Sequence, residues 1–202
     1  SDLSESNIKT RRKFVKLDEQ PDYIKFGRLR PFQMQGVNFL AHNWCRGTNV
    51  ILADEMGLGK TVQTVSFMNW LRHDRDQDGP FICVVPLSTM PAWADTFNNW
   101  TPDINYVIYT GREDARSIIR DKELLVDGNP KKIKFNVLLT TYEYVLADWQ
   151  FLSSIKWQFL AVDEAHRLKN RESQLYEKLR GFSAPSRLLT TGTPIQNTLG
   201  EL

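Results

Sequence analysis

A glycine-rich segment follows the first apolar run of the sequence. Residues Asn49–Ala53 are mostly apolar, and the next eight residues, DEMGLGKT, lead directly into a helical pattern that begins at Lys60. A strand, a glycine-rich loop and a helix in this order bind phosphate, because backbone N–H groups and the positive end of the helix converge on the phosphate oxygens. The candidate nucleotide-binding residues are therefore Asp54, Glu55, Met56, Gly57, Leu58, Gly59, Lys60 and Thr61.

Two residues of this segment carry specific chemistry. Lys60 is placed to reach the terminal phosphates, and the Thr61 hydroxyl is placed to ligate Mg²⁺ that bridges phosphate oxygens. One position departs from the general GxxxxGK[ST] pattern, because Asp54 stands where the first glycine is expected. Gly57 and Gly59 retain flexibility near the phosphates, so the sequence still predicts an ATP site with Mg²⁺.

An acidic pair follows another apolar run. Trp157–Val162 reads as a buried strand, and Asp163, Glu164, Ala165 and His166 come directly after it. The carboxyl ends of parallel strands meet at one crevice, so this tetrapeptide is expected to face Lys60 and Thr61. Asp163 would hold Mg²⁺ through water, and Glu164 would orient and deprotonate the attacking water. The candidate catalytic residues are Glu164, Asp163 and Lys60, and the candidate metal ligands are Thr61 and Asp163.

The elements that position these residues alternate along the chain. Short apolar runs are separated by longer amphipathic stretches, which predicts an α/β fold with a mainly parallel sheet flanked by helices. The apolar face expected of the first helix consists of Phe32, Val37, Phe39, Leu40 and Trp44. The predicted strands are 49–53, 81–85, 104–109, 135–140, 157–162 and 187–190; the predicted helices are 31–46, 60–73, 91–100, 113–125, 142–148 and 172–180; residues 74–80 and 127–134 are predicted loops.

Composition excludes several protein classes. The 202 residues carry a formal net charge of +2, too small for a polycation that binds nucleic acid everywhere on its surface. No stretch is long and apolar enough to span a membrane, and Ser1–Lys16 has no secretory pattern. Cys45 and Cys83 lie in apolar surroundings and are expected to be buried, reduced thiols. Lys131, Lys132 and Lys134 form a basic cluster that is either solvated or a contact for DNA phosphate.

Six motifs in order resemble the superfamily-two helicase-like ATPases, in particular the Swi/Snf-type chromatin remodelling branch. The phosphate loop at 54–61 and the DEAH box at 163–166 are joined by four further segments, and residues 20–24 and 86–93 are most similar to the chromodomain-helicase-DNA-binding remodelers. The resemblance implies a RecA-like P-loop NTPase lobe. The four further segments are LRPFQ at 29–33, PLS at 86–88, TTYE at 140–143 and TGTPIQN at 191–197.

The resemblance also implies roles for individual residues. Gln33 would read the adenine edge; Gln35 competes for this role, but two residues apart on a helix the two side chains cannot face the same way. His166 would couple nucleotide state to DNA, whereas His42 and His73 read as helix-surface residues. The residues expected to contact DNA are Pro86, Leu87, Ser88, Thr140, Thr141 and Tyr142, and those expected to act with His166 in coupling are Thr191, Gly192 and Thr193.

By this resemblance the chain divides into a leader at 1–27 and a first ATP-binding lobe at 28–202. A second RecA-like lobe, absent from these residues, is expected downstream in the same parent chain, with chromodomain-like modules upstream. The expected function is DNA-dependent ATP hydrolysis in the nucleus. This hydrolysis would drive translocation on duplex DNA and slide nucleosomes, with no membrane contact. Two alternatives stay open, a strand-separating helicase and, for the isolated fragment, a module that binds nucleotide or DNA without turnover.

Overall fold

A parallel sheet runs through the centre of the protein. The computed structural model describes residues 13–53, 59–168 and 174–192. In these residues the main sheet has six strands in the order β1-β8-β7-β2-β6-β3, and every neighbouring pair is parallel. The predicted fold class is therefore confirmed, and each predicted strand is found. The strands are β1 (Val50–Ala53), β2 (Phe81–Val84), β3 (Tyr106–Tyr109), β6 (Val137–Thr140), β7 (Phe159–Val162) and β8 (Arg187–Thr191).

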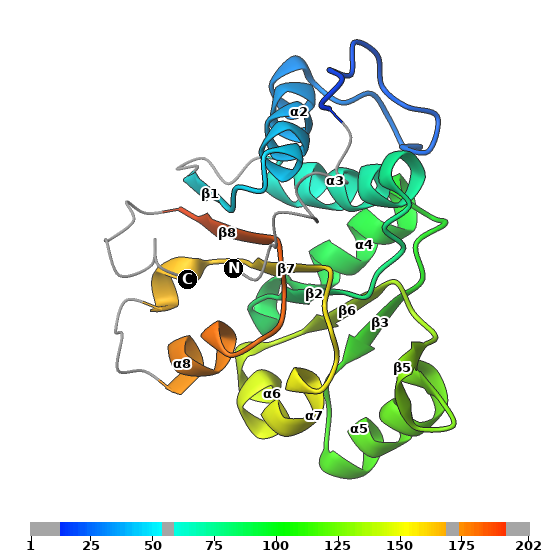
Figure 1. Ribbon diagram of the computed structural model, residues 1–202, viewed down its shortest axis with the longest axis vertical. Helices are drawn as coiled ribbons and strands as arrows, with labels where there is room; N and C mark the ends of the chain where they lie inside the picture. Colours follow the sequence, from blue (N-terminus) through cyan, green and yellow to red (C-terminus); the bar gives the residue numbers. More distant parts are fainter. Residues whose placement is uncertain (1–12, 54–58, 169–173, 193–202) are drawn as a thin grey trace.

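Helices cover both faces of the sheet (Figure 1). On one face lie α2 (Pro31–Cys45), α3 (Lys60–Arg75) and α4 (Met90–Trp100). The other face carries α5 (Glu113–Ile119) with its π-helical extension η2 (Arg120–Leu124), α6 (Tyr142–Ala147), α7 (Trp149–Ser153) and α8 (Gln174–Arg180). Two short 3-10 helices, η1 (Leu87–Thr89) and η3 (Ala165–Leu168), follow β2 and β7. No helix in the described ranges is both long and apolar enough to cross a membrane.

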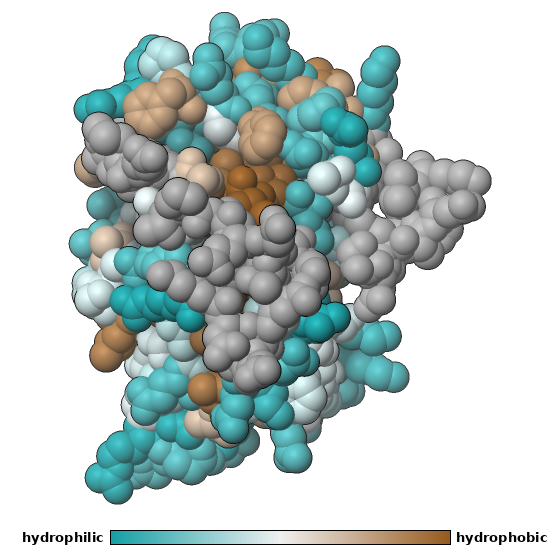
Figure 2. Space-filling view, turned by 90° about the vertical axis from the view of Figure 1, so that its left-hand side faces the viewer, coloured by the Kyte–Doolittle hydropathy of each residue, from teal (hydrophilic) through white to brown (hydrophobic). Residues whose placement is uncertain are grey.

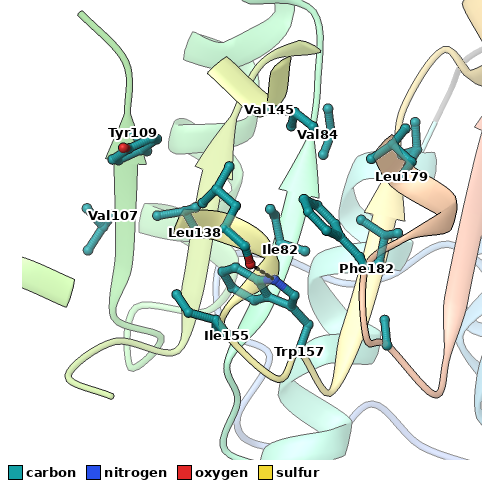
Figure 3. Packing of buried hydrophobic residues seen from close by; sticks show 14 of the residues in the cluster. Ile82, Val84, Val107, Tyr109, Leu138, Val145, Ile155, Trp157, Leu179 and Phe182 are labelled. Atoms are coloured by element: carbon teal, nitrogen blue, oxygen red, sulfur yellow. Dashed lines mark hydrogen bonds between the residues drawn. The ribbon is translucent and has the colours of Figure 1, made fainter. Parts of the chain in front are cut away.

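Each strand places alternate side chains in two separate cores. In β2, Phe81 and Cys83 pack beneath α2, α3 and α4, whereas Ile82 and Val84 pack against the helices of the opposite face. Because both faces are covered, β2 and β7 are apolar at every position, which is why the sequence shows them as continuous apolar runs. Figure 3 shows the second core around Trp157, whose indole N–H donates to the Leu152 carbonyl at 2.9 Å.

A β-hairpin replaces one predicted loop. Residues 127–134 were expected to be a loop, but Leu125–Val126 (β4) and Asn129–Ile133 (β5) pair as antiparallel strands. Asp127 and Gly128 both have positive φ, 52° and 70°, and an Asp-Gly pair with two positive φ values forms the tight turn that matches strand twist. The other predicted loop, 74–80, starts later than expected, because α3 continues to Arg75.

The first helix uses a narrower apolar face than predicted. Phe32 and Phe39 were expected in its core face, but 44% and 49% of their surfaces are exposed. The reason is the close contact of α2 with α3: a Cβ at Gly36 would lie 2.0 Å from Gln63 Oε1, so the helices meet at Gly36. This contact rotates Phe32 and Phe39 away from the core. The buried residues of α2 are Val37, Leu40, Ala41 and Trp44.

The described part of the predicted leader packs on α2, α3 and α4. Asn38 exchanges two hydrogen bonds with the backbone of Leu17, and Asn69 donates to the Tyr23 carbonyl at 2.9 Å. His73 is exposed on α3, as predicted, and it also stacks on the Tyr23 ring and contacts Asp103 at 2.6 Å. The domain boundary at residue 27 stays a prediction. The two cysteines form no disulfide, and Cys83 is buried whereas Cys45 is half-buried.

Candidate active site

Five strands end side by side at one edge of the sheet. Ala53 of β1 lies opposite Thr191 of β8, and Val162 of β7 lies opposite Val84 of β2. Thr140 of β6 lies opposite Val84 on its other side. The segments that follow these strands therefore emerge on the same face. Figure 2 shows this face, where a compact hydrophobic area in the upper half lies among mostly hydrophilic coloured residues. This edge carries the predicted catalytic and DNA-contacting segments.

Gly59 ends the phosphate loop at the start of α3 and lies close to α2. Five residues of the loop lie outside the described residues: Asp54, Glu55, Met56, Gly57 and Leu58. Gly59 adopts a left-handed φ of 86° as the N-cap of α3, and a Cβ there would lie 2.8 Å from Gln33 Nε2. The loop therefore needs glycine at this position both for its backbone angle and for its closeness to Gln33. Lys60 and Thr61 follow in the first turn of α3.

The two candidate glutamines face different surroundings. Gln33 accepts a hydrogen bond from Arg30 N at 2.8 Å and contacts Gly59. Gln35 instead lines a cavity beneath residues 16–29. Gln33 thus lies beside Gly59, the described end of the phosphate loop, which favours the prediction that Gln33 reads the base.

Lys60 is linked to the end of β8. Its Nζ donates to the Thr191 carbonyl at 2.9 Å, and the Thr191 hydroxyl lies 3.1 Å from His166 Nδ1. A lysine ammonium has three donors, so Lys60 can keep this bond and still donate to a phosphate oxygen. Lys60, Thr191 and His166 were predicted from three separate motifs, and the fold joins them in one chain of contacts. Gly192 follows, exposed, and Thr193 lies outside the described residues.

Asp163 receives hydrogen bonds from neutral groups. Thr190 Oγ1 donates to Oδ1 at 2.5 Å, and Trp93 Nε1 donates to Oδ2 at 3.3 Å. The backbone N–H of Glu164 also donates to Oδ1, at 3.0 Å. Within the described ranges no lysine or arginine forms an ion pair with this carboxylate. The orientation of this carboxylate is therefore fixed by neutral donors.

Glu164 has a strained backbone and an under-bonded side chain. Its φ is 51°, a left-handed value that is uncommon for a residue other than glycine. Its Oε2 is buried and accepts no hydrogen bond from the described residues; Arg167 Nη2 lies 3.1 Å away as an ion pair but is not aligned for a hydrogen bond. Strain and an unsatisfied polar atom persist where the surrounding structure enforces them, which is typical of functional sites.

Tyr142 contacts the same acidic turn, Asp163–Glu164, from the face of the sheet that carries α6. Its hydroxyl donates to the Asp163 carbonyl and lies 3.4 Å from the Glu164 carbonyl. Burial, followed by the negative charge of Asp163, raises the pKa of Tyr142 well above its usual value, so this hydroxyl remains protonated at neutral pH. Burial and Asp163 also raise the pKa of the Cys83 thiol, which is therefore kept as an unreactive thiol.

The segments predicted to contact DNA differ in exposure. Leu87 and Ser88 are exposed, whereas Pro86, Thr140 and Thr141 are buried. The Thr140 hydroxyl donates to the Tyr109 carbonyl at 2.7 Å, and the Tyr142 hydroxyl is bonded to the acidic turn. The hydroxyls of Thr140 and Tyr142 thus donate inside the protein. The DNA contact expected of residues 140–142 stays a prediction.

A basic hairpin lies at the opposite end of the strands. Lys131 and Lys132 are in β5, and Lys134 N donates to the Leu124 carbonyl, just before β6 begins at Val137. Phe81 and Tyr106, the first residues of β2 and β3, lie opposite Val137. The lysines are therefore at the amino ends of the strands, away from Asp163.

Sequence reasoning missed two residues of the site, Trp93 and Thr190. Both donate to the Asp163 carboxylate although they are 70 and 27 residues away along the chain. A local motif could not reveal Trp93, because its role depends on the packing of α4 beside β7. Thr190 had one signal: it ends a predicted strand and immediately precedes the TGTPIQN motif.

A second carboxylate, Asp148, lies between α6 and α7. Arg116 Nε and Arg120 Nη1 approach its Oδ2 at 2.7 and 3.3 Å, and the Tyr109 hydroxyl donates to the same oxygen. Burial raises the pKa of Asp148, but the hydrogen bonds from Arg116 and Tyr109 outweigh this and hold it below its usual value. Burial and Asp148 together raise the pKa of Tyr109 to about 12. Glu113 completes this ionic cluster by pairing with both arginines.

Comparison with known proteins identifies similar sequences and folds. A family model described as SNF2-related domain matches residues 32–202. Chromodomain-helicase-DNA-binding protein 1 of Gallus gallus is 50% identical over 198 residues, which are 96% of this chain and 12% of that protein. Protein CHROMATIN REMODELING 5 of Arabidopsis thaliana is 50% identical over 203 residues, 99% of this chain and 12% of that protein.

A solved structure has the same fold. The Sulfolobus solfataricus SWI2/SNF2 ATPase core in complex with dsDNA superposes with a TM-score of 0.75 and 27% sequence identity. The match covers 92% of this chain and 36% of that chain. The chain thus spans about an eighth of the length of the curated relatives, which are 12% covered, and about a third of the solved core, which is 36% covered.

Proposed function

The chain belongs to the SNF2-related domain family, and from this membership we propose that it is the ATP-binding lobe of a DNA-translocating ATPase that slides nucleosomes. One observation carries the proposal: the fold brings Lys60, Thr191 and His166 together at the edge where Asp163 and Glu164 end a buried strand. This is the constellation needed for phosphoryl transfer to water, with a phosphate-binding cation, a metal-binding carboxylate and a base.

The residues present fit ATP with Mg²⁺. Asp163 is a carboxylate without a cationic partner in the described residues, and the Thr61 hydroxyl follows directly after Lys60; both are hard oxygen donors. Among the described residues, no three His, Cys, Asp or Glu side chains gather as a metal site. That agrees with Mg²⁺, which proteins usually hold with one or two side chains plus substrate phosphates. When bound, Mg²⁺ would neutralise charge on the phosphate oxygens.

The chain's own residues then have distinct tasks. Residues 54–61 would cradle the phosphates, with Lys60 donating to the terminal phosphates and Gln33 reading the adenine edge. Glu164 would orient a water and accept its proton, which suits a carboxylate oxygen that is buried and accepts no hydrogen bond in the described residues. His166 and Thr191 would report the state of the phosphate site to the neighbouring segments through their contact.

The proposed partners lie outside the lobe. A second RecA-like lobe of the same parent protein would supply arginines to the transferred phosphoryl group, and duplex DNA on a nucleosome would be the substrate track. The similarity to chromodomain-helicase-DNA-binding protein 1 supports chromodomain-like modules upstream and a nuclear location. The dsDNA-bound SWI2/SNF2 core supports duplex DNA as the ligand.

The test is steady-state ATP hydrolysis in Mg²⁺ buffer, with the 202-residue chain and the full-length protein side by side, each with and without duplex DNA. The proposal predicts DNA-stimulated hydrolysis by the full-length protein, and nucleotide binding with little turnover by the 202-residue chain. Comparison of nucleosomes with naked DNA then tests sliding. Absence of DNA stimulation in the full-length protein would contradict the proposed function.

A further inference from the structure

Two aromatic side chains, from helices on opposite faces of the sheet, donate hydrogen bonds to the acidic turn. Trp93 belongs to α4, which follows the segment 86–88, and packs in the core on one face. Tyr142 opens α6, which follows Thr140 and Thr141, and packs against the core on the other face. Each helix thus starts from a segment predicted to contact DNA and sends one side chain to the same turn, Asp163–Glu164.

The two side chains hold different atoms of that turn. Trp93 Nε1 donates to the carboxylate oxygen Oδ2 of Asp163 at 3.3 Å, and its indole is 2% exposed, so its orientation is fixed by packing. The Tyr142 hydroxyl donates to the main-chain carbonyl of Asp163, directly before the left-handed Glu164. One residue therefore fixes the carboxylate and the other fixes the backbone.

We propose that Trp93 and Tyr142 are positioning residues, which set the orientation of Asp163 and Glu164 according to the positions of α4 and α6. This inference rests on the proposed function and names residues through which DNA contact would act on the same site. A shift of either helix changes the hydrogen bond that it makes to the turn. Because Glu164 is held at a strained φ of 51°, loss of the Tyr142 bond relaxes the residue that would activate water.

The arrangement is more specific than ordinary packing. An apolar ring at position 142 would fill the same space, yet the hydroxyl donates to the Asp163 carbonyl, and the Arg167 guanidinium lies over the ring, 5.9 Å from its centroid. Arg167 also pairs with Glu164, so Tyr142 touches both the backbone and the ionic partner of the candidate base. Removing only the Tyr142 hydroxyl therefore tests the positioning of the turn while the packing of the ring is kept.

The experiment uses the full-length protein with Tyr142→Phe and Trp93→Phe, each with a matched control. Tyr144→Phe removes a hydroxyl from the same helix while its ring still lies 5.0 Å from the Arg116 guanidinium, and Trp100→Phe makes the same substitution at the other end of α4. We expect Tyr142→Phe to lower DNA-stimulated kcat about fivefold with an unchanged KM for ATP, the size of one hydrogen bond. Tyr144→Phe and Trp100→Phe are expected to stay within about twofold of wild type.

A second readout does not depend on hydrolysis. Hydrogen–deuterium exchange of the peptide spanning 160–168, measured without nucleotide, is expected to speed up in Tyr142→Phe and in Trp93→Phe but not in the controls. The two substitutions should combine non-additively in kcat, because both act on one turn. Exchange and kcat equal to those of the control variants would overturn the proposal.

The outcomes also separate the two proposals. If the wild-type protein shows no DNA-stimulated hydrolysis, the proposed function fails, and the exchange measurement alone decides whether Trp93 and Tyr142 hold the turn. If the wild-type protein is stimulated by DNA and Tyr142→Phe is stimulated equally, the positioning role fails while the proposed function stands. Tyr142→Phe removes a single oxygen, so folding is retained and the result is decisive even if Trp93→Phe is unstable.

Discussion

Asp148 and Asp163 are two carboxylates on the same lobe with opposite environments. Asp148 receives Arg116, Arg120 and the Tyr109 hydroxyl, and its side chain is only 9% exposed. Asp163 receives an indole, a hydroxyl and a backbone N–H, all neutral. The first carboxylate has its charge neutralised by the protein, and the second has only its direction fixed.

The two environments distinguish an aspartate that stabilises the fold, Asp148, from an aspartate proposed to take part in the chemistry, Asp163. A buried charge must be paired, and Asp148 with its arginines ties α5 and η2 to the junction of α6 and α7. Asp163 keeps an uncompensated charge beside a strained Glu164, which is unfavourable for stability unless a cation binds. Stability should therefore depend on Asp148, and chemistry on Asp163 and Glu164.

The largest expected effect is on turnover, from Glu164→Gln. The amide keeps the size of the side chain but cannot accept the proton of water, so DNA-stimulated kcat should fall by about 10²–10⁴-fold. ATP affinity, measured by calorimetry on the same preparation, should stay close to wild type, because the amide leaves the phosphate loop untouched. Retained hydrolysis would remove Glu164 from the role of base.

A second large effect is expected on the free energy of unfolding, from Asp148→Asn. The substitution leaves Arg116, whose side chain is 11% exposed, facing a neutral amide, and a broken buried pair costs about 3 kcal/mol or more. Urea unfolding at neutral pH measures this loss. A change below about 0.5 kcal/mol, the range of ordinary surface substitutions, would place Asp148 among them.

A smaller effect is expected on the pH dependence of the unfolding free energy that Asp148 contributes. The pKa of Asp148 is lowered in the folded protein, so its stabilising contribution is complete above the ordinary pKa of about 3.9 and is lost as the pH falls through the folded value. The difference in unfolding free energy between wild type and Asp148→Asn should therefore shrink between about pH 6 and pH 3. An equal difference at both pH values would argue against an ionic contribution.

The smallest effect is expected from the basic hairpin. Lys131, Lys132 and Lys134 lie at the amino ends of the strands, opposite the edge that carries Asp163. Replacing all three by alanine should leave the salt dependence of binding to a short duplex unchanged. Each lysine that does contact phosphate would reduce the slope of log affinity against log salt by about 0.9, so a reduced slope would restore the DNA-binding interpretation.

The sequence predicted the parts of the fold that have local causes. The buried strands read as apolar runs because both faces of the sheet are covered, and the phosphate loop and acidic pair are contiguous segments. The β4–β5 hairpin also had a local signal, the Asp127-Gly128 pair, which the loop prediction overlooked.

The remaining features depend on residues that are distant in the sequence. Trp93 reaches Asp163 across 70 positions, and Arg116 reaches Asp148 across 32. The exposure of Phe32 and Phe39 follows from the contact of Gly36 with Gln63, which no periodicity within α2 could reveal. Which of the aspartates is neutralised was thus unpredictable from local pattern, although the position of Asp163 was predicted.

We propose that Asp163 holds its charge for a bound cation rather than for the fold. The most direct test measures thermal unfolding and DNA-stimulated ATP hydrolysis on one preparation of the full-length protein carrying Asp163→Asn. We expect an unfolding midpoint no lower than that of wild type together with loss of hydrolysis. A lowered midpoint with hydrolysis retained would contradict it and would make Asp163 a structural carboxylate like Asp148.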